Sequence, residues 1–110
     1  MQIDERISKL AENILKNSVQ LKKGEKIYIE AFGASTKDFF NELIKETIKL
    51  GAVPFYFYND ASFEKSLIDG ADKQQIEAYT AIHRHLMEDA DCYVAVRGYD
   101  DVFRERAGAE

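Results

Sequence analysis

One stretch, residues 26–58, constrains the fold more than any other, because it reads as strand, helix and strand in direct succession. Residues 26–32 and 53–58 are short runs of β-branched and aromatic residues bounded by turn residues. This pattern is typical of strands that are buried on both faces. Two such strands joined by a helix predict a βαβ unit with parallel strands and a right-handed crossover.

The crossover helix has a recognisable start and end. Ser35 or Thr36 is expected to cap its N-terminus, and Asp38 lies in the first turn, where the helix dipole favours a carboxylate. Gly51 follows the helix at the place where a left-handed C-terminal cap is expected. Pro54 is the one discordant residue of the unit, since it cannot donate a hydrogen bond, but it is tolerated near the start of a strand.

The rest of the chain supplies further elements. Apolar residues at helical spacing predict helices over residues 3–17, 61–68 and 72–90, and a third strand covers residues 92–97. Residues 99–110 are charged and lack a long pattern, and the chain stops where we expect the next crossover helix to begin. The predicted fold class is a three-layer α/β domain with a mostly parallel sheet around the βαβ core. We expect it to be an incomplete portion of a larger Rossmann-like domain, and the strand order stays open.

Charge and composition exclude some classes of partner. The 110 residues carry a net charge of -5, which disfavours nucleic acid and an anionic membrane surface as partners. The N-terminus lacks the basic and apolar regions of a secretory signal, and no apolar run is long enough to span a membrane. The single cysteine, Cys92, lies within a predicted strand, which favours a buried structural thiol and a reducing, cytoplasmic setting.

Three loops follow the carboxyl ends of the predicted strands, where open α/β sheets bind ligands. The loop at residues 32–36 offers backbone amides at a helix N-terminus, but it lacks both glycine-rich phosphate-binding motifs, so a plain turn and cap is favoured. At residues 59–62, Asp60 is expected to cap the next helix. The loop at residues 97–101 combines a cation, a glycine and two carboxylates, and a solvated loop is favoured there.

Two histidines, His83 and His85, lie two residues apart on a predicted helix and therefore point to different sides. Metal-binding pairs on helices are spaced by three or four residues, so a metal site is not favoured. We expect His83 to be a hydrogen-bonded histidine at the edge of the core and His85 to lie on the surface.

The local sequence resembles one known family. Four segments carry the resemblance: residues 21–29 (LKKGEKIYI), 39–52 (FFNELIKETIKLGA), 58–60 (YND) and 90–98 (ADCYVAVRG). Together they resemble the N-terminal domain of the thermophilic-type metallo-aminopeptidases, the aminopeptidase T and leucyl aminopeptidase group. The similarity covers essentially all 110 residues and consists of scaffold motifs.

The resemblance implies a two-domain cytoplasmic enzyme that removes N-terminal amino acids from peptides and works as a homodimer. It also implies two divalent metal ions, usually zinc, cobalt or magnesium, held by residues of a C-terminal domain. None of the ligand motifs is present here, so no catalytic, cofactor-binding or metal residue is assigned. Residues 1–110 are then expected to be the N-terminal α/β domain of a longer enzyme, inactive alone.

Two alternatives come from other classes of protein. The chain could be a stand-alone module that binds a small anion or nucleotide at residues 33–36 and 59–60. It could also be an interaction domain whose exposed strand edge recruits a partner.

Overall fold

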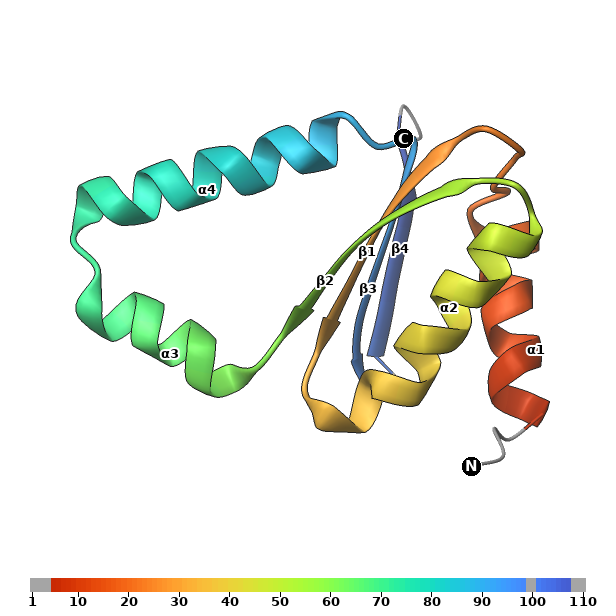
Figure 1. The fold of residues 1–110 in the computed structure, drawn as a ribbon, viewed down its shortest axis with the longest axis horizontal. Coiled ribbons are helices and arrows are strands. Elements are labelled where there is room, and N and C mark those ends of the chain that lie inside the picture. Colours follow the sequence, from red (N-terminus) through yellow and green to blue (C-terminus); the bar gives the residue numbers. More distant parts are fainter. Residues whose placement is uncertain (1–4, 99–100, 108–110) are drawn as a thin grey trace.

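The computed structural model describes residues 5–98 and 101–107 of the chain (Figure 1). The helices are α1 (Glu5–Asn13), which runs into a π-helical turn (Ile14–Ser18), α2 (Lys37–Lys49), which follows a 3-10 turn (Ala34–Thr36), α3 (Ala61–Gly70) and α4 (Lys73–Glu88). The strands are β1 (Lys26–Phe32), β2 (Val53–Asn59), β3 (Cys92–Gly98) and β4 (Asp101–Arg106).

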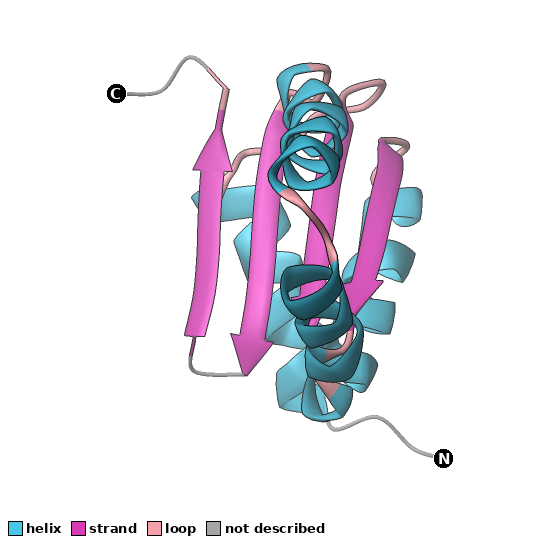
Figure 2. Cartoon of the chain, turned by 90° about the vertical axis from the view of Figure 1, so that its left-hand side faces the viewer, coloured by secondary structure: helices cyan, strands magenta, loops and turns pink. Residues whose placement is uncertain are grey.

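The four strands form one sheet in the order β2-β1-β3-β4. β1 is parallel to both β2 and β3, whereas β4 is antiparallel to β3. Figure 2 shows helices on both sides of this sheet. The predicted three-layer α/β fold with a mostly parallel sheet is confirmed.

The core lies between the sheet and the pair of helices α1 and α2. Ile27, Ile29 and Ala31 alternate along β1 and point toward these helices, where Phe39 and Leu43 of α2 meet them. All five side chains are fully buried. Ile14 and Leu15 of the π-helical turn close the same core from the α1 side. The helix predicted over residues 3–17 is therefore present from Glu5, and Ile3 lies outside the described residues.

The sequence pattern predicted no element for residues 99–110, whereas residues 101–106 form β4. β4 lies at the edge of the sheet, so its side chains need no apolar pattern. Val102 packs against the core, whereas Phe103 on the opposite face is 52% exposed. Residues 99–100 and 108–110 lie outside the described part of the chain.

The prediction that residues 53–58 are buried on both faces was also wrong. β2 is an edge strand and none of its residues is fully buried; the side chain of Tyr56 is 63% exposed and that of Phe57 is 38% exposed. Apolar composition alone cannot distinguish a central strand from an edge strand whose outer side is uncovered.

The helices α3 and α4 extend away from the sheet and contribute no buried residue (Figure 1). An aspartate caps the N-terminus of each helix, Asp60 for α3 and Asp72 for α4. The Asp72 side chain accepts a hydrogen bond from the Gln75 N–H at 2.8 Å, and the Gln75 side chain accepts one from the Asp72 N–H at 2.9 Å. The helices form as predicted, but their apolar faces are left largely open.

Within residues 5–98 and 101–107, none of the helices has the length and apolar character needed to cross a membrane.

Candidate functional site

The first two loops at the carboxyl edge of the sheet lie side by side. The Gly33 N–H donates to the carbonyl oxygen of Asn59 at 3.0 Å, and the Thr36 hydroxyl donates to the Gly33 carbonyl at 2.7 Å. Gly33 has a φ of 94°, a conformation that favours glycine. Thr36 lies at the N-cap position of α2 as predicted, but its side chain makes no capping bond there because it turns back to Gly33.

Asp60 caps α3, as its position after β2 predicted. Its carboxylate accepts from the Ser62 N–H at 2.8 Å and from the Ser62 hydroxyl at 2.6 Å. These two bonds lower the pKa of the Asp60 carboxyl below its usual value. The Thr36 hydroxyl and the Asp60 carboxylate of these two loops therefore already bond to the chain itself.

The third loop is only partly described, since residues 99–100 and the side chain of Asp101 lie outside the described part. Its first residue, Arg97, places its guanidinium 5.3 Å from the centre of the Phe32 ring. This distance is within the range of a cation–π contact, which links β3 to the end of β1.

A polar cluster that the sequence did not predict lies on the sheet face opposite the core. Glu30, in the middle of β1, is only 4% exposed. Its carboxylate accepts a 2.7 Å hydrogen bond from the Tyr93 hydroxyl, and His83 Nε2 of α4 lies 3.0 Å from the same oxygen. The Tyr28 ring lies between them, with centroids 5.5 Å from His83 and 5.7 Å from Tyr93.

The cluster gives His83 its partner and keeps the two tyrosines from acting as bases. His83 has a partner in Glu30, as the helix pattern predicted, but it lies on the sheet face opposite the core and not at the core edge; His85 is exposed, as predicted. Burial, together with the neighbouring Glu30 carboxylate, raises the pKa of the Tyr28 and Tyr93 hydroxyls above its usual value. Both phenols therefore stay protonated near neutral pH and do not supply a base.

The cluster does not fit a metal site. Within the described part of the chain, no three His, Cys, Asp or Glu side chains lie close enough together to hold a metal ion. Glu30 and His83 provide one carboxylate and one imidazole, whereas catalytic zinc sites use three protein ligands. The arrangement can orient α4 over the sheet, but it does not assemble a nucleophile, base and oxyanion donor.

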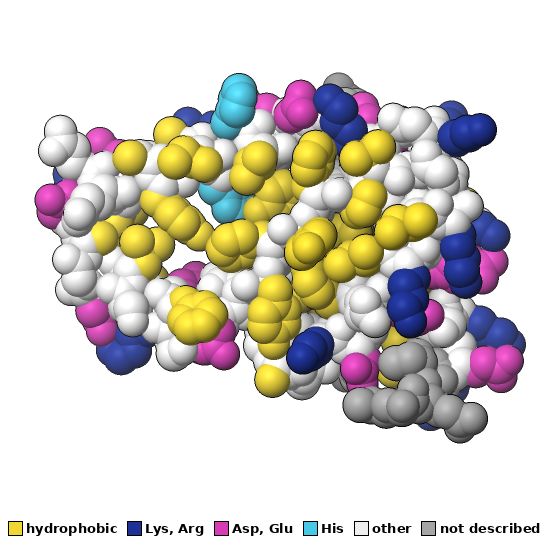
Figure 3. All heavy atoms as spheres, in the orientation of Figure 1, with side chains coloured by type: hydrophobic (Ala, Val, Ile, Leu, Met, Phe, Trp, Pro, Cys, Tyr) yellow, Lys and Arg dark blue, Asp and Glu magenta, His cyan; other side chains and the backbone are white. Residues whose placement is uncertain are grey.

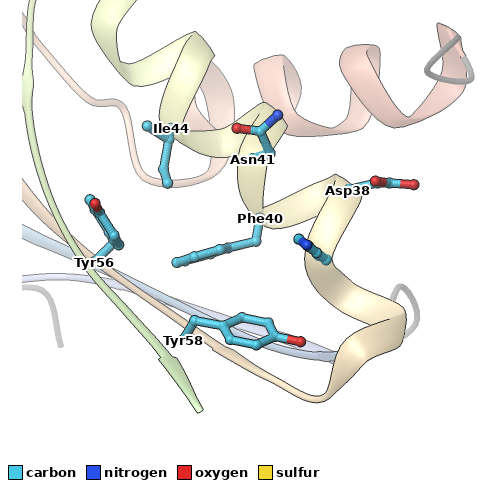
Figure 4. Close-up of a pocket in the computed structure, with 7 residues that line it drawn as sticks. Asp38, Phe40, Asn41, Ile44, Tyr56 and Tyr58 are labelled. Atoms are coloured by element: carbon cyan, nitrogen blue, oxygen red, sulfur yellow. The ribbon is translucent and has the colours of Figure 1, made fainter. Parts of the chain in front are cut away.

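An open groove of about 570 Å³ lies on the other side of the sheet, between α2 and β2. Figure 4 shows Phe40 and Ile44 of α2 facing Tyr56 and Tyr58 of β2 across it. The Phe40 ring lies 5.9 Å from each of the two tyrosine rings. The groove is thus aromatic, and it opens at the outer edge of the sheet.

The free thiol of Cys92 is buried, as predicted. Arg106 of β4 donates to Cys92 Sγ at 3.0 Å and to the Val19 carbonyl at 3.1 Å, and it also pairs with the Glu25 carboxylate. Burial raises the pKa of the Cys92 thiol, although Arg106 acts in the opposite direction. This clamp joins β4 to the segment before β1 and has a structural role.

These features define a class of domain before they define a family. The α/β sheet brings polar loops to one edge, satisfies them internally, and holds no group of metal ligands in the part of the chain that the structure describes. The class is therefore an α/β domain with a mostly parallel sheet.

Comparison with known proteins identifies the family. The family model of the thermophilic metalloproteases (M29) matches residues 3–104, so the chain belongs to that family. Among solved structures, the fold is similar to that of wild-type AmpT from Thermus thermophilus, with a TM-score of 0.59 and 24% identity. The match covers 86% of this chain and 25% of the AmpT chain, so this chain corresponds to about a quarter of AmpT. No curated protein sequence matches the chain.

Proposed function

We propose that the chain is the N-terminal scaffold portion of a metal-dependent aminopeptidase that hydrolyses N-terminal amino acids from peptides. The observation that carries the proposal is the M29 family match over residues 3–104. In this proposal the metal ligands lie outside these residues, so the 110-residue chain has no activity alone. The absence of a group of metal ligands among residues 5–98 and 101–107 supports this point.

The finer parts of the proposal follow from the family resemblance. The complete enzyme would be cytoplasmic and homodimeric and would use two divalent ions, zinc, cobalt or magnesium. When bound, those ions would supply Lewis-acid activation of water and of the peptide carbonyl. The part described here would wall the active-site cavity, and the large uncovered apolar side chains of β2, α3 and α4 support contact with further protein surface.

The alternative of a stand-alone module for anions or nucleotides is less well supported. The Thr36 hydroxyl, which could donate to an anion, is bonded to Gly33, and the Asp60 carboxylate, which could accept from a ribose, is bonded to Ser62. A ligand would have to replace these hydrogen bonds to reach either group.

Reading the gene beyond the codon for Glu110 tests the proposal. We expect the frame to continue into a region with glutamate, histidine, tyrosine and aspartate ligands, and we expect its product to release N-terminal amino acids only with divalent metal. A continuation without such ligands, or a product that lacks metal-dependent turnover, would contradict it.

A further inference from the structure

We propose that the outer edge of β2 is a self-association surface, where a second copy of this chain adds its own β2 in antiparallel orientation around a two-fold axis at Tyr56. The proposal specifies the surface for the homodimer named above. It does not depend on the aminopeptidase activity.

The direction of the backbone groups of β2 follows from two hydrogen bonds. The Val53 N–H donates to the Glu25 carbonyl at 2.8 Å, and the Asn59 carbonyl accepts from the Gly33 N–H at 3.0 Å. Both bonds point toward the β1 side. Because backbone groups of successive residues face opposite edges of a strand, those of Pro54, Tyr56 and Tyr58 face outward. The missing N–H of Pro54 is therefore harmless within this chain.

The outer edge carries no charged residue, and Pro54 is the one residue of β2 that is typical of a protected edge. Edge strands of natural proteins commonly carry charged residues that block further pairing, and β2 has none among Val53–Asn59. Exposed apolar side chains flank it instead: Val53 is 46% exposed, Tyr56 63%, and Ile48 of the adjoining α2 61%. Figure 3 shows hydrophobic side chains gathered across the middle of this face.

Two copies of this edge complement each other. With the axis at Tyr56, the two Tyr56 residues exchange both of their backbone hydrogen bonds. The Tyr58 N–H then meets the carbonyl of Pro54 in the second copy. Pro54 cannot donate, so this register leaves no outward N–H of either strand without an acceptor.

A two-fold axis brings each residue close to its own equivalent, so a charged residue at the axis would meet a like charge. The groove beside the axis is lined there by Phe40, Asn41 and Ile44, which are uncharged. Its charged residues, Lys37 and Asp38, have opposite signs. No two like charges of the groove therefore meet at the axis.

The register is also specified. An axis at Tyr56 pairs every residue of β2, from Val53 opposite Asn59 to Asn59 opposite Val53. An axis at Phe57 would leave Val53 unpaired and would place Asp60, the cap of α3, opposite Pro54.

Cross-linking tests the register. In a hydrogen-bonded antiparallel pair the Cα atoms lie about 5.5 Å apart, within the range that a disulfide bridges. Under mild oxidation, Tyr56→Cys is expected to give a covalent dimer, while Cys92 stays unreactive because it is buried. Val53→Cys is the matched control, since its copies would lie about 20 Å apart. Equal cross-linking of both variants, or of neither, overturns the proposal.

A charge introduced at the axis tests the association itself. Wild-type chain is expected to sediment as a dimer, and Tyr56→Lys, which places two ammonium groups at the axis, is expected to raise the dissociation constant at least about tenfold. Ile68→Lys on α3, where the native residue is 61% exposed, controls for the loss of an exposed apolar side chain and should leave the dimer intact. A monomeric wild-type chain overturns the proposal and leaves the family assignment standing.

Discussion

At the scale of single residues, Glu30 shows how a charge is accommodated in a buried strand. It interrupts the apolar run of β1, and its burial is stabilised by the Tyr93 hydroxyl and by His83. A lone carboxylate in a predicted core strand was the available signal for this cluster. Its partners come from β3 and α4, more than fifty residues further along the chain, so the pairing could not be predicted without the topology.

The Glu30 cluster predicts the effect of losing one donor. Tyr93→Phe leaves the buried Glu30 carboxylate with one hydrogen bond fewer, which is expected to lower the free energy of unfolding by about 1–3 kcal/mol. Tyr56→Phe, at a position that is 63% exposed, is expected to change it by less than about 0.5 kcal/mol. Urea denaturation of both variants measures the difference, and equal stability of the two would contradict this role for Glu30.

The clamp between Arg106 and Glu25 predicts a pH dependence. The hydrogen bond from Arg106, assisted by the Lys22 N–H, lowers the pKa of the Glu25 carboxyl in the folded chain. The stabilisation is therefore present above the unfolded value of about 4.3 and is lost as the pH falls through the lower folded value. Between about pH 5 and pH 3, the urea midpoint of wild type should fall more steeply than that of Glu25→Gln. Parallel curves would show that the pair contributes nothing.

At the scale of secondary-structure elements, the sequence predicted those whose local signals agree with their packing. The helix α2 has its apolar stripe, its position after Thr36 and its terminal Gly51, and β1 has its continuous apolar run. β4 was missed because its formation depends on the free edge of β3 rather than on its own pattern. β2 was predicted as a strand, but its exposure was not, because the sequence of a strand does not show which other elements will cover it.

The glycines at the ends of α2 and α3 supply a matched pair of substitutions. Gly51 has a φ of 77°, so Gly51→Ala is expected to destabilise the fold by about 1–2 kcal/mol. Gly70 ends α3 without a positive φ, and an added Cβ there would meet no atom within 4 Å. Gly70→Ala should therefore be neutral or stabilise by up to about 1 kcal/mol. Thermal unfolding compares the two, and a larger loss for Gly70→Ala would contradict the assigned cap.

At the scale of the whole molecule, the two faces of the sheet differ. One face carries the core formed with α1 and α2, and the other carries the Glu30 cluster, where His83 of α4 reaches the sheet. The family was predicted from scaffold motifs along the chain and is confirmed by the match over residues 3–104. Those motifs form strands of the sheet and the helix that packs on it. They therefore identify the family without assigning an active-site residue.

The central claim is that this chain is a scaffold whose enzyme draws its metal ligands from other residues. The most direct measurement is an aminopeptidase assay of the purified 110-residue chain on a leucyl anilide, with zinc, cobalt or magnesium added in turn. The account predicts no release of leucine above the metal-only blank and no metal retained after gel filtration. Metal-dependent release of leucine by this chain alone would contradict it.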